Sequence, residues 1–523
     1  MKSLVLYLRK NRTLWITVAV LLFLLMLAFQ GMATQDWVVT LLRSLSVAAV
    51  TFLVASGFSL IFGLLDVLNL AQGTLFMVGA YVAWTVYVRP DTFIDILTPF
   101  CLLVAGFTLL PLWDFMANRV NGRNILARLW PWAGLLLAGA LILYTLKLYP
   151  ITIWNPGVYS QSPGTYSLMA DTGARLIPPA VTFGAASPVL VLGGILLASL
   201  LLTFSLVGFQ NRRNTDVSGK SLHLPWTYLV SFLAVLAVGL LVFIFNTPLT
   251  TAIVGLGSNW LFVIAIVVAL LTGVLLGSLI ESSLIRPLYS RPIYQLMITL
   301  GLSAVGIELV RAIWGRPEFT MPKPEIFNGS GANCPAASLV SAFQNHCSTF
   351  LFMDSRIRVY NEIFIPLVGV IVLVAIWILL QRTRIGMIIR AGVQDREMVE
   401  ALGINVRRVF TFVFALGVGT ATLGGALAGP SMGISTAMGG SLLLNALIAL
   451  AIGGLTSFPG AAVGSLLVGL MQQFIIKYGQ IGIQLPFLAE PFKPTPPLVP
   501  ASTVLLMVII LLVLPHGLLG RKE

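Results

Sequence analysis

The sequence has 523 residues, of which 58% are hydrophobic and only 9% are charged. Soluble domains carry about 25% charged and about 45–50% apolar residues, so a soluble or nucleic-acid-binding protein is excluded. The formal charge of +13 comes from 31 basic and 18 acidic residues. In membrane proteins such a surplus usually sets topology and contacts lipid headgroups. The composition therefore predicts an all-α, polytopic helical membrane protein that contacts membrane lipid.

Residue types that carry catalysis or metal binding are sparse. The sequence has three cysteines and three histidines, too few and too far apart for a metal motif. Gly219-Lys220-Ser221 resembles the end of an ATP-binding phosphate loop, but Asn214 stands where its first glycine should be. We therefore expect no cofactor, metal site or catalytic residue in this chain.

Apolar runs long enough to cross a bilayer core alternate with loops that carry charge, proline or glycine. The predicted helices lie near 13–30, 38–63, 67–88, 95–113, 129–148, 184–208, 226–246, 256–280, 295–314, 361–381, 409–428, 440–454, 460–477 and 500–519. Gly453-Gly454 and Pro459-Gly460 separate two of the last three helices, because paired glycine and proline end or kink a helix. The total is about fourteen transmembrane helices.

The distribution of basic residues predicts the orientation. With both termini in the cytoplasm, the inner segments hold 20 of the 31 Lys and Arg residues, as the positive-inside rule requires. The first segment, 1–37, is predicted to be an uncleaved transmembrane helix. A cleaved signal peptide is the alternative, because Gly31 and Ala33 are spaced like a cleavage site. The downstream topology is the same in both cases.

Two long loops, 149–183 and 315–360, fall on the outer side in this topology. The second contains Cys334 and Cys347, which are candidates for a disulfide because disulfides persist outside the cytoplasm. Such a bridge would contribute roughly 3 kcal/mol in the chain-entropy model. Two free thiols in a mobile loop are the alternative.

A cluster of polar and small residues interrupts the apolar segment 57–81, beginning at Asp66. Polar side chains at membrane depth are costly and usually face a bundle interior or a water-filled path. The candidate translocation-pathway residues are Asn69, Gln72, Gly73, Thr74, Thr299 and Asn445. The alternative for this segment is a helical hairpin with its turn near Asp66 at the inner surface.

The inner loop 382–408 predicts a short amphipathic helix. Asp395 can cap its start and Gly403 is placed to end it. Met398, Ala401 and Leu402 fall on one face at helical spacing. A helix this short is unstable alone in water, so we expect it to dock into a partner's groove or to rest on the lipid surface. Periodicity does not distinguish these two.

Several motifs together resemble the branched-chain amino acid ABC transporter permease family. They are GFSLIFGLLDVLNLAQG (57–73), ESSLIRPLYSRP (281–292), ITLGLS (298–303), RTRIGMIIRAGVQDREMVEALGINVRR (382–408) and ALIALAIGGLTSFPGAAVGSLLVGLMQ (446–472). The resemblance covers residues 38–88 and 256–520. The family often has histidine in the segment matching Asn69–Gly73, where this chain has Gln72.

The resemblance implies a domain organisation and a set of partners. Residues 38–88 and 256–523 would form the permease core, and 89–255 an inserted block of about four extra helices. The partners would be ABC ATPase subunits, a second and usually non-identical permease subunit, and an extracytoplasmic solute-binding protein. The ATPase-coupling residues would be Asp395, Arg396, Glu397, Met398, Glu400, Ala401, Leu402, Gly403 and Ile404.

We therefore expect a permease subunit of an ABC importer in the inner membrane of a prokaryote, carrying branched-chain or other apolar amino acids. Urea or a short amide is the alternative substrate within the superfamily. An ion-gradient-driven secondary transporter is the alternative from another class. Such carriers commonly place ionisable residues at the membrane midplane, whereas the charged residues of this chain cluster near the helix ends. A membrane scaffold or lipid-binding protein is the third, and it offers no reason for glycine-rich broken helices.

Overall fold

The computed structural model describes residues 31–110, 125–151, 186–211, 226–289, 291–315, 318–331, 334–394, 396–483 and 490–520, with a few single positions outside these ranges. The chain divides into two compact units. Unit 1 comprises 1–88, 159–174 and 258–523, and unit 2 comprises 89–158 and 175–257.

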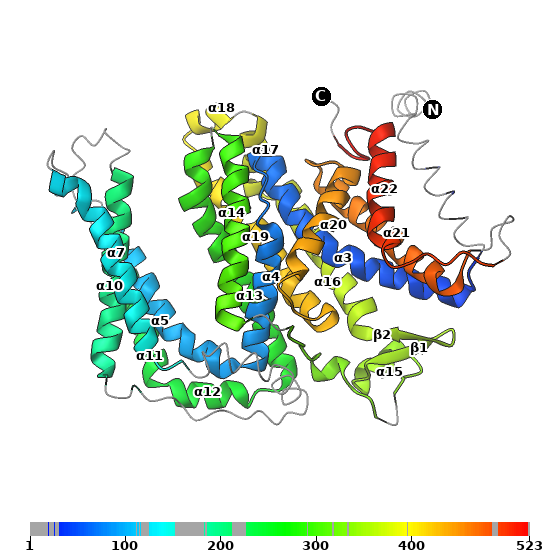
Figure 1. Cartoon of the computed structure of the whole chain (residues 1–523), viewed down its shortest axis with the longest axis horizontal. Coiled ribbons are helices and arrows are strands. Elements are labelled where there is room, and N and C mark those ends of the chain that lie inside the picture. Colours follow the sequence, from blue (N-terminus) through cyan, green and yellow to red (C-terminus); the bar gives the residue numbers. More distant parts are fainter. Residues whose placement is uncertain are drawn as a thin grey trace. The chain divides into compact units, whose positions relative to one another are not determined.

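Unit 1 contains the long helices that most of the apolar runs predict (Figure 1). These are α3 (Thr34–Leu65), α4 (Gln72–Val88), α13 (Ser258–Ile280), α14 (Pro292–Trp314), α16 (Ile365–Arg382), α19 (Val406–Met432), α20 (Met438–Gly453), α21 (Phe458–Ile481) and α22 (Leu498–Val513). Two short helices, α17 (Arg384–Gln394) and α18 (Arg396–Ala401), join α16 to α19. A π-helical turn, η1 (Glu281–Ile285), and a 3₁₀ turn, η2 (Arg286–Leu288), follow α13.

The core of unit 1 forms where α19 packs against α3, α4 and α13. These contacts are close because small residues face one another: a Cβ on Gly57 of α3 would overlap the carbonyl oxygen of Gly417 on α19. In a bilayer, close backbone approach of this kind replaces the hydrophobic driving force between helices. Large side chains fill the remaining space, and Leu53, Phe76 and Phe414 are fully buried.

A small folded element lies at the end of unit 1 opposite α18 (Figure 1). It contains η3 (Glu325–Phe327), α15 (Leu339–Gln344) and an antiparallel hairpin of β1 (Thr349–Phe352) and β2 (Ser355–Arg358), paired in the register Phe350 to Ile357. A disulfide joins Cys334 to Cys347. A π-helix, η4 (Val359–Phe364), leads from the hairpin into α16.

Unit 2 is also helical. Its described helices are α5 (Pro90–Thr108), α7 (Ile125–Leu148), α10 (Pro188–Asn211), α11 (Trp226–Ile244) and α12 (Asn246–Val254). Helix α7 packs on α10, and α5 packs on α11. Near the start of α5, Arg89 and Asp91 form a buried ion pair at 2.5 Å, and the Asn246 amide donates to Asp95 at 2.8 Å.

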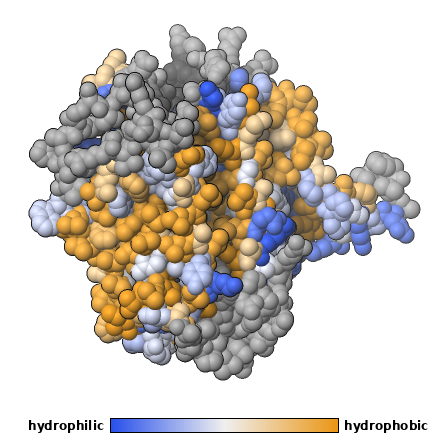
Figure 2. Space-filling view, turned by 60° about the vertical axis from the view of Figure 1, so that its left-hand side comes forward, coloured by the Kyte–Doolittle hydropathy of each residue, from blue (hydrophilic) through white to orange (hydrophobic). Residues whose placement is uncertain are grey.

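The structure confirms a polytopic helical membrane protein. Ten described helices are long and apolar enough to cross a membrane, and α20 and α22 are shorter apolar helices. Hydrophobic residues cover most of the coloured surface in Figure 2, and exposed side chains such as Leu137 and Val230 suit contact with lipid. The predicted helix 13–30 lies outside the described ranges, and α12 was not predicted. The total of about fourteen spans, the cytoplasmic termini and the inserted nature of 89–255 stay predictions.

Candidate functional site

The polar cluster of the first motif forms a break between α3 and α4. Helix α3 ends at Leu65. Its C-cap residue, Asp66, has a left-handed backbone with φ 55°, and the Asp66 backbone amide donates to the Phe62 carbonyl at 2.9 Å. The chain then turns back into the bundle. There the side-chain amide of Gln72 donates to the carbonyl of Gly417, in the fourth turn of α19, at 2.6 Å. Asn69 donates to Gln72 at 3.1 Å, and both side chains are fully buried.

The non-helical backbone of this break is satisfied within the protein. The amide of Ala71 donates to the Asn69 side chain at 3.2 Å, and the Thr299 hydroxyl of α14 donates to the Leu68 carbonyl at 3.3 Å. Non-helical backbone at membrane depth is tolerated only where it is buried in protein or lines a water-filled cavity. In this structure the break is held by hydrogen bonds to α14 and α19.

The remaining pathway candidates of this region also connect helices. The hydroxyls of Thr74 and Ser303 lie 2.6 Å apart and join α4 to α14. A Cβ on Gly73 would overlap the carbonyl oxygen of Gly439 on α20. The structure therefore gathers five of the six candidates around the α3–α4 break, and their role in translocation stays a prediction.

Asn445 lies elsewhere, on a cavity of about 210 Å³. Its side-chain oxygen accepts from Gln472 of α21 at 3.1 Å. The same cavity is lined by Arg43, Arg358 and Glu362. The Glu362 carboxylate is completely buried and accepts from the Nε atoms of Arg43 at 3.0 Å and Arg358 at 3.3 Å.

No sequence motif indicated this group, because Arg43 and Glu362 are 319 residues apart. Lys323 adds a further positive charge nearby. Burial lowers the pKa of the Lys323 ammonium, Arg358 lowers it further, and Glu362 raises it.

The predicted amphipathic helix of the inner loop is α18, which lies at one end of unit 1 (Figure 1). Gly403 follows it with φ 80°. The Gly403 amide donates to the Glu400 carbonyl at 3.0 Å, and the Ile404 amide donates to the Val399 carbonyl at 3.4 Å. These two bonds define a Schellman C-cap, in which glycine accepts the left-handed conformation at little cost.

The faces of α18 differ in exposure. Val399 is buried against Val406 and Phe410 of α19, together with Ile404 and Tyr289. On the neighbouring part of the helix surface, Met398 is 60% and Leu402 is 72% exposed. Glu400 and Ala401 are exposed as well. Asp395 and the side chains of Arg396 and Glu397 lie outside the described part of the chain.

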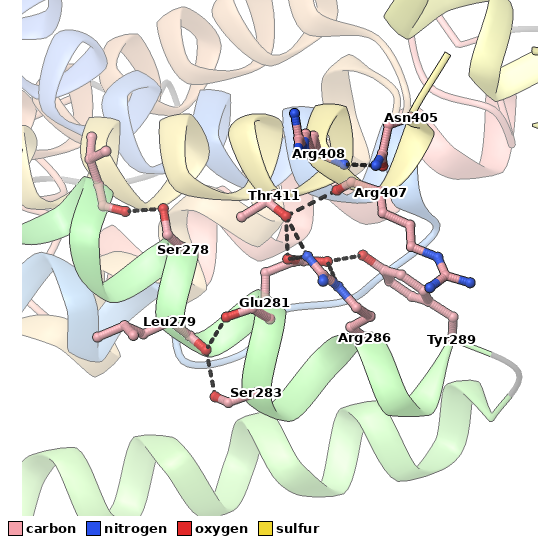
Figure 3. A network of polar contacts seen from close by, with 12 residues as sticks. Ser278, Leu279, Glu281, Ser283, Arg286, Tyr289, Asn405, Arg407, Arg408 and Thr411 are labelled. Atoms are coloured by element: carbon pink, nitrogen blue, oxygen red, sulfur yellow. Dashed lines mark hydrogen bonds and ion pairs between the residues drawn. The ribbon is translucent and has the colours of Figure 1, made fainter. Parts of the chain in front are cut away.

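A buried carboxylate connects the turn after α13 to the start of α19 (Figure 3). Glu281 is completely buried and pairs with Arg286, Nη2 to Oε2 at 2.9 Å. Its carboxylate also accepts from the Tyr289 hydroxyl and from the Thr411 hydroxyl, each at 2.6 Å. The Tyr289 ring packs edge-on against Phe410, with ring centroids 5.9 Å apart.

In the sequence, the charges of Glu281, Arg286 and Arg291 indicate a belt at the inner surface of the membrane. The burial of Glu281 instead makes it a connection between elements. Because Tyr289 and Phe410 also contact the residues that anchor α18, the network lies next to the base of that helix. The i, i+5 spacing of Glu281 and Arg286 was the available signal in the sequence, and Thr411 was not predictable from it.

The fold is that of a polytopic helical membrane protein. The family described as the branched-chain amino acid transport system / permease component matches residues 180–514. The chain belongs to this family.

Characterised relatives carry related descriptions. The high-affinity branched-chain amino acid transport system permease protein LivH of Salmonella typhimurium is 26% identical over 272 residues, which cover 51% of this chain and 78% of the relative. The Escherichia coli protein of the same description is 27% identical over the same coverage. Permease protein BraD of Pseudomonas aeruginosa is 28% identical over 172 residues, 33% of this chain and 51% of the relative. No solved structure matches the chain significantly.

Proposed function

We propose that this chain is the membrane-spanning permease subunit of an ABC importer for branched-chain or other apolar amino acids. In this proposal α18 seats in a cleft of a partner ATPase in the cytoplasm. A second permease subunit completes the pore, and an extracytoplasmic solute-binding protein delivers the substrate. ATP hydrolysis takes place in the partner subunits, so no catalytic residue or cofactor is required of this chain.

The observation that carries the proposal is the exposed apolar face of α18. Met398 and Leu402 are 60% and 72% exposed, which is costly for two large apolar side chains on a charged surface loop. A partner groove that buried both would recover about 1.5–3 kcal/mol for each side chain. Val399 and the Schellman cap hold this face in a fixed orientation, so a partner could push on it as on a rigid element.

The base of α18 connects directly to the helices of the core. Val399 packs on α19, and the Thr411 hydroxyl of α19 donates to the carboxylate of Glu281, the residue that directly follows α13. A displacement of α18 would therefore act on α19 and α13 together. This supports a mechanical role, in which ATP-driven closure of the partners changes the access of the pore.

The family and its relatives support the proposed substrate class. The relatives described above are permeases of branched-chain amino acid transport systems. A further relative, at 29% identity over 143 residues, is a fructose import permease protein of Rhizobium meliloti. Its match covers 27% of this chain, about half the share that the LivH proteins cover, so we favour amino acids.

The test uses the full chain, reconstituted with its candidate partner subunits in proteoliposomes. Leu402→Asp places a charge on the exposed face, and Gly403→Pro is incompatible with the φ of 80° at the cap. Both should abolish co-purification of the ATPase and ATP-dependent uptake of radiolabelled L-leucine. Met353→Asp is the matched control, because Met353 is 53% exposed at the tip of the hairpin, at the other end of unit 1.

Two results would contradict the proposal. If Leu402→Asp retained ATPase binding and uptake, α18 would not be the coupling element. If uptake continued without any ATPase and followed a proton or sodium gradient, the chain would be a secondary transporter. Glu281 and Glu362 would then be the ionisable residues to examine.

A further inference from the structure

A cavity of about 210 Å³ lies inside unit 1, at the junction of α3, η4, the start of α20 and α21. Ligand pockets for drug-sized molecules occupy about 300–1,000 Å³, so this cavity suits a smaller solute. Its polar lining includes Arg43, Arg358, Asn361, Glu362, Asn445 and Gln472. Two of them, Asn361 and Glu362, belong to the π-helix η4, and π-helical turns occur frequently at functional sites.

The charges of the cavity do not balance among themselves. Among the described residues of the lining, Glu362 is the single acidic one; it is completely buried, and its carboxylate accepts from Arg43, from Arg358 and from the backbone amide of Arg358. The side chains of Arg43 and Arg358 are 39% and 46% exposed. One buried carboxylate therefore positions two cations, and one positive charge is left over at the wall. A guanidinium fork matches a carboxylate with two hydrogen bonds.

The rest of the lining divides into an amide wall and an apolar wall. Asn445 and Gln472 bond to each other, and the Asn361 oxygen accepts from Ser431 at 3.0 Å. Amide oxygens of this kind can accept from an ammonium group. The apolar wall consists of Val47, Val50, Met432 and Leu442. The cavity thus offers arginine for the carboxylate of an apolar amino acid, amide oxygens for its ammonium group and aliphatic side chains for its side chain.

We propose that this cavity binds a branched-chain α-amino acid, with its carboxylate on Arg43 and Arg358 and its side chain against Val47, Val50 and Leu442. The inference rests on the proposed function for the choice of substrate class. It adds that the permease itself recognises the substrate, in addition to any recognition by a solute-binding protein. The anionic headgroup of a phospholipid is the competing occupant, and the small volume and the amide wall favour the amino acid.

The test measures binding of radiolabelled L-leucine to the full chain in lipid nanodiscs, up to millimolar concentrations, without solute-binding protein. Val47→Phe fills the cavity and should weaken binding by at least about tenfold. Leu45→Phe is its matched control, because Leu45 lies two residues away on α3 and is 40% exposed. Arg358→Gln removes one guanidinium, while Arg43 still pairs with Glu362, and should weaken binding by a similar factor. Thermal unfolding of each variant checks that it remains folded.

Analogues separate the parts of the ligand. Isoamylamine lacks the carboxylate and should not compete with leucine, whereas isocaproate lacks the amine and should compete weakly. Absence of saturable leucine binding, or equal binding by wild type and Val47→Phe, would overturn the inference even if ATP-dependent uptake is intact. Phosphatidylglycerol that co-purifies with wild type but not with Arg358→Gln, without an effect on leucine binding, would assign the cavity to lipid. Failure of the proposed function would appear separately, as loss of ATPase association or of ATP-dependent uptake.

Discussion

The Arg286 guanidinium donates two parallel hydrogen bonds to the Glu281 carboxylate, Nε to Oε1 at 3.2 Å and Nη2 to Oε2 at 2.9 Å. Arg286 also donates to the Thr411 hydroxyl at 2.7 Å, and Thr411 in turn donates to Glu281. Glu281, Arg286 and Thr411 thus form a closed set of three hydrogen-bonded side chains. The set joins two elements of the fold, and Glu281 and Thr411 are 130 residues apart in the sequence. Glu281 is completely buried in it, whereas Arg286 is 36% exposed.

Replacement of Glu281 by Ala should destabilise the protein strongly. The change leaves Arg286, Tyr289 and Thr411 without their shared acceptor, and breaking a buried pair in this way costs about 3–5 kcal/mol. We expect a lower midpoint of thermal unfolding in detergent, measured by tryptophan fluorescence. Glu308→Ala is the control, because the Glu308–Arg311 pair is exposed and such pairs contribute about 0–1 kcal/mol. Equal losses in the two variants would refute the structural role of the Glu281 network.

A methyl group on Gly57 should separate α3 from α19. The added Cβ would overlap the Gly417 carbonyl oxygen and the Gln72 amide, and overpacking of this kind costs about 1–3 kcal/mol. Gly301→Ala is the matched control, because nothing lies within 4 Å of a Cβ at that position on α14. Gly301→Ala should be neutral or slightly stabilising, since alanine favours helix more than glycine does. The comparison is made by thermal unfolding, and equal stability of the two variants would argue against close α3–α19 packing.

Removal of the Gln72 amide should destabilise the break between α3 and α4. In Gln72→Leu, the side-chain amide of Asn69 loses its acceptor in a buried environment, whereas the Gly417 carbonyl keeps the hydrogen bond from the Thr420 hydroxyl. An unsatisfied buried polar group costs about 1–3 kcal/mol. We expect faster hydrogen exchange of the 66–75 backbone by mass spectrometry, with Gln473→Leu on α21 as the control. Unchanged exchange would mean that Gln72 does not hold the break.

Reduction of the Cys334–Cys347 disulfide should loosen the hairpin element. The closed loop is short, and its loss corresponds to about 3 kcal/mol in the chain-entropy model. The double variant Cys334→Ser/Cys347→Ser should be cleaved faster by protease between residues 334 and 358, whereas Cys101→Ser should not be. Mass spectrometry of non-reduced peptides checks the bridge directly. Detection of both thiols in free form would contradict it.

The sequence was most informative where structure depends on local pattern. Apolar run length predicted the long helices to within a few residues, because a helix that crosses the bilayer core needs about 20 consecutive, mainly apolar residues. The cap at Gly403 was predictable because a left-handed position strongly favours glycine. The polar cluster after Asp66 also indicated a break, since buried polar groups need partners.

Contacts between distant segments were not predictable from one sequence. Glu362 and Arg43 are 319 residues apart, and nothing local distinguishes either one from an ordinary surface charge. The same holds for Thr411 and Glu281. Helix α17 was also missed as a separate helix, because its basic residues made the segment read as part of a charged loop. Partner choice and translocation roles depend on surfaces and states that composition and spacing do not encode.

The contact between Gly57 and Gly417 has a consequence for motion. Because backbone atoms touch at this point, few side-chain rotamers there can rearrange to absorb a displacement of one helix against the other. We therefore expect α3 and α19 to move together as one rigid body, with little displacement of one helix relative to the other. A small push on the α18 end of α19 would then reach the far end of α3, on which Arg43 lies, as a rigid-body shift.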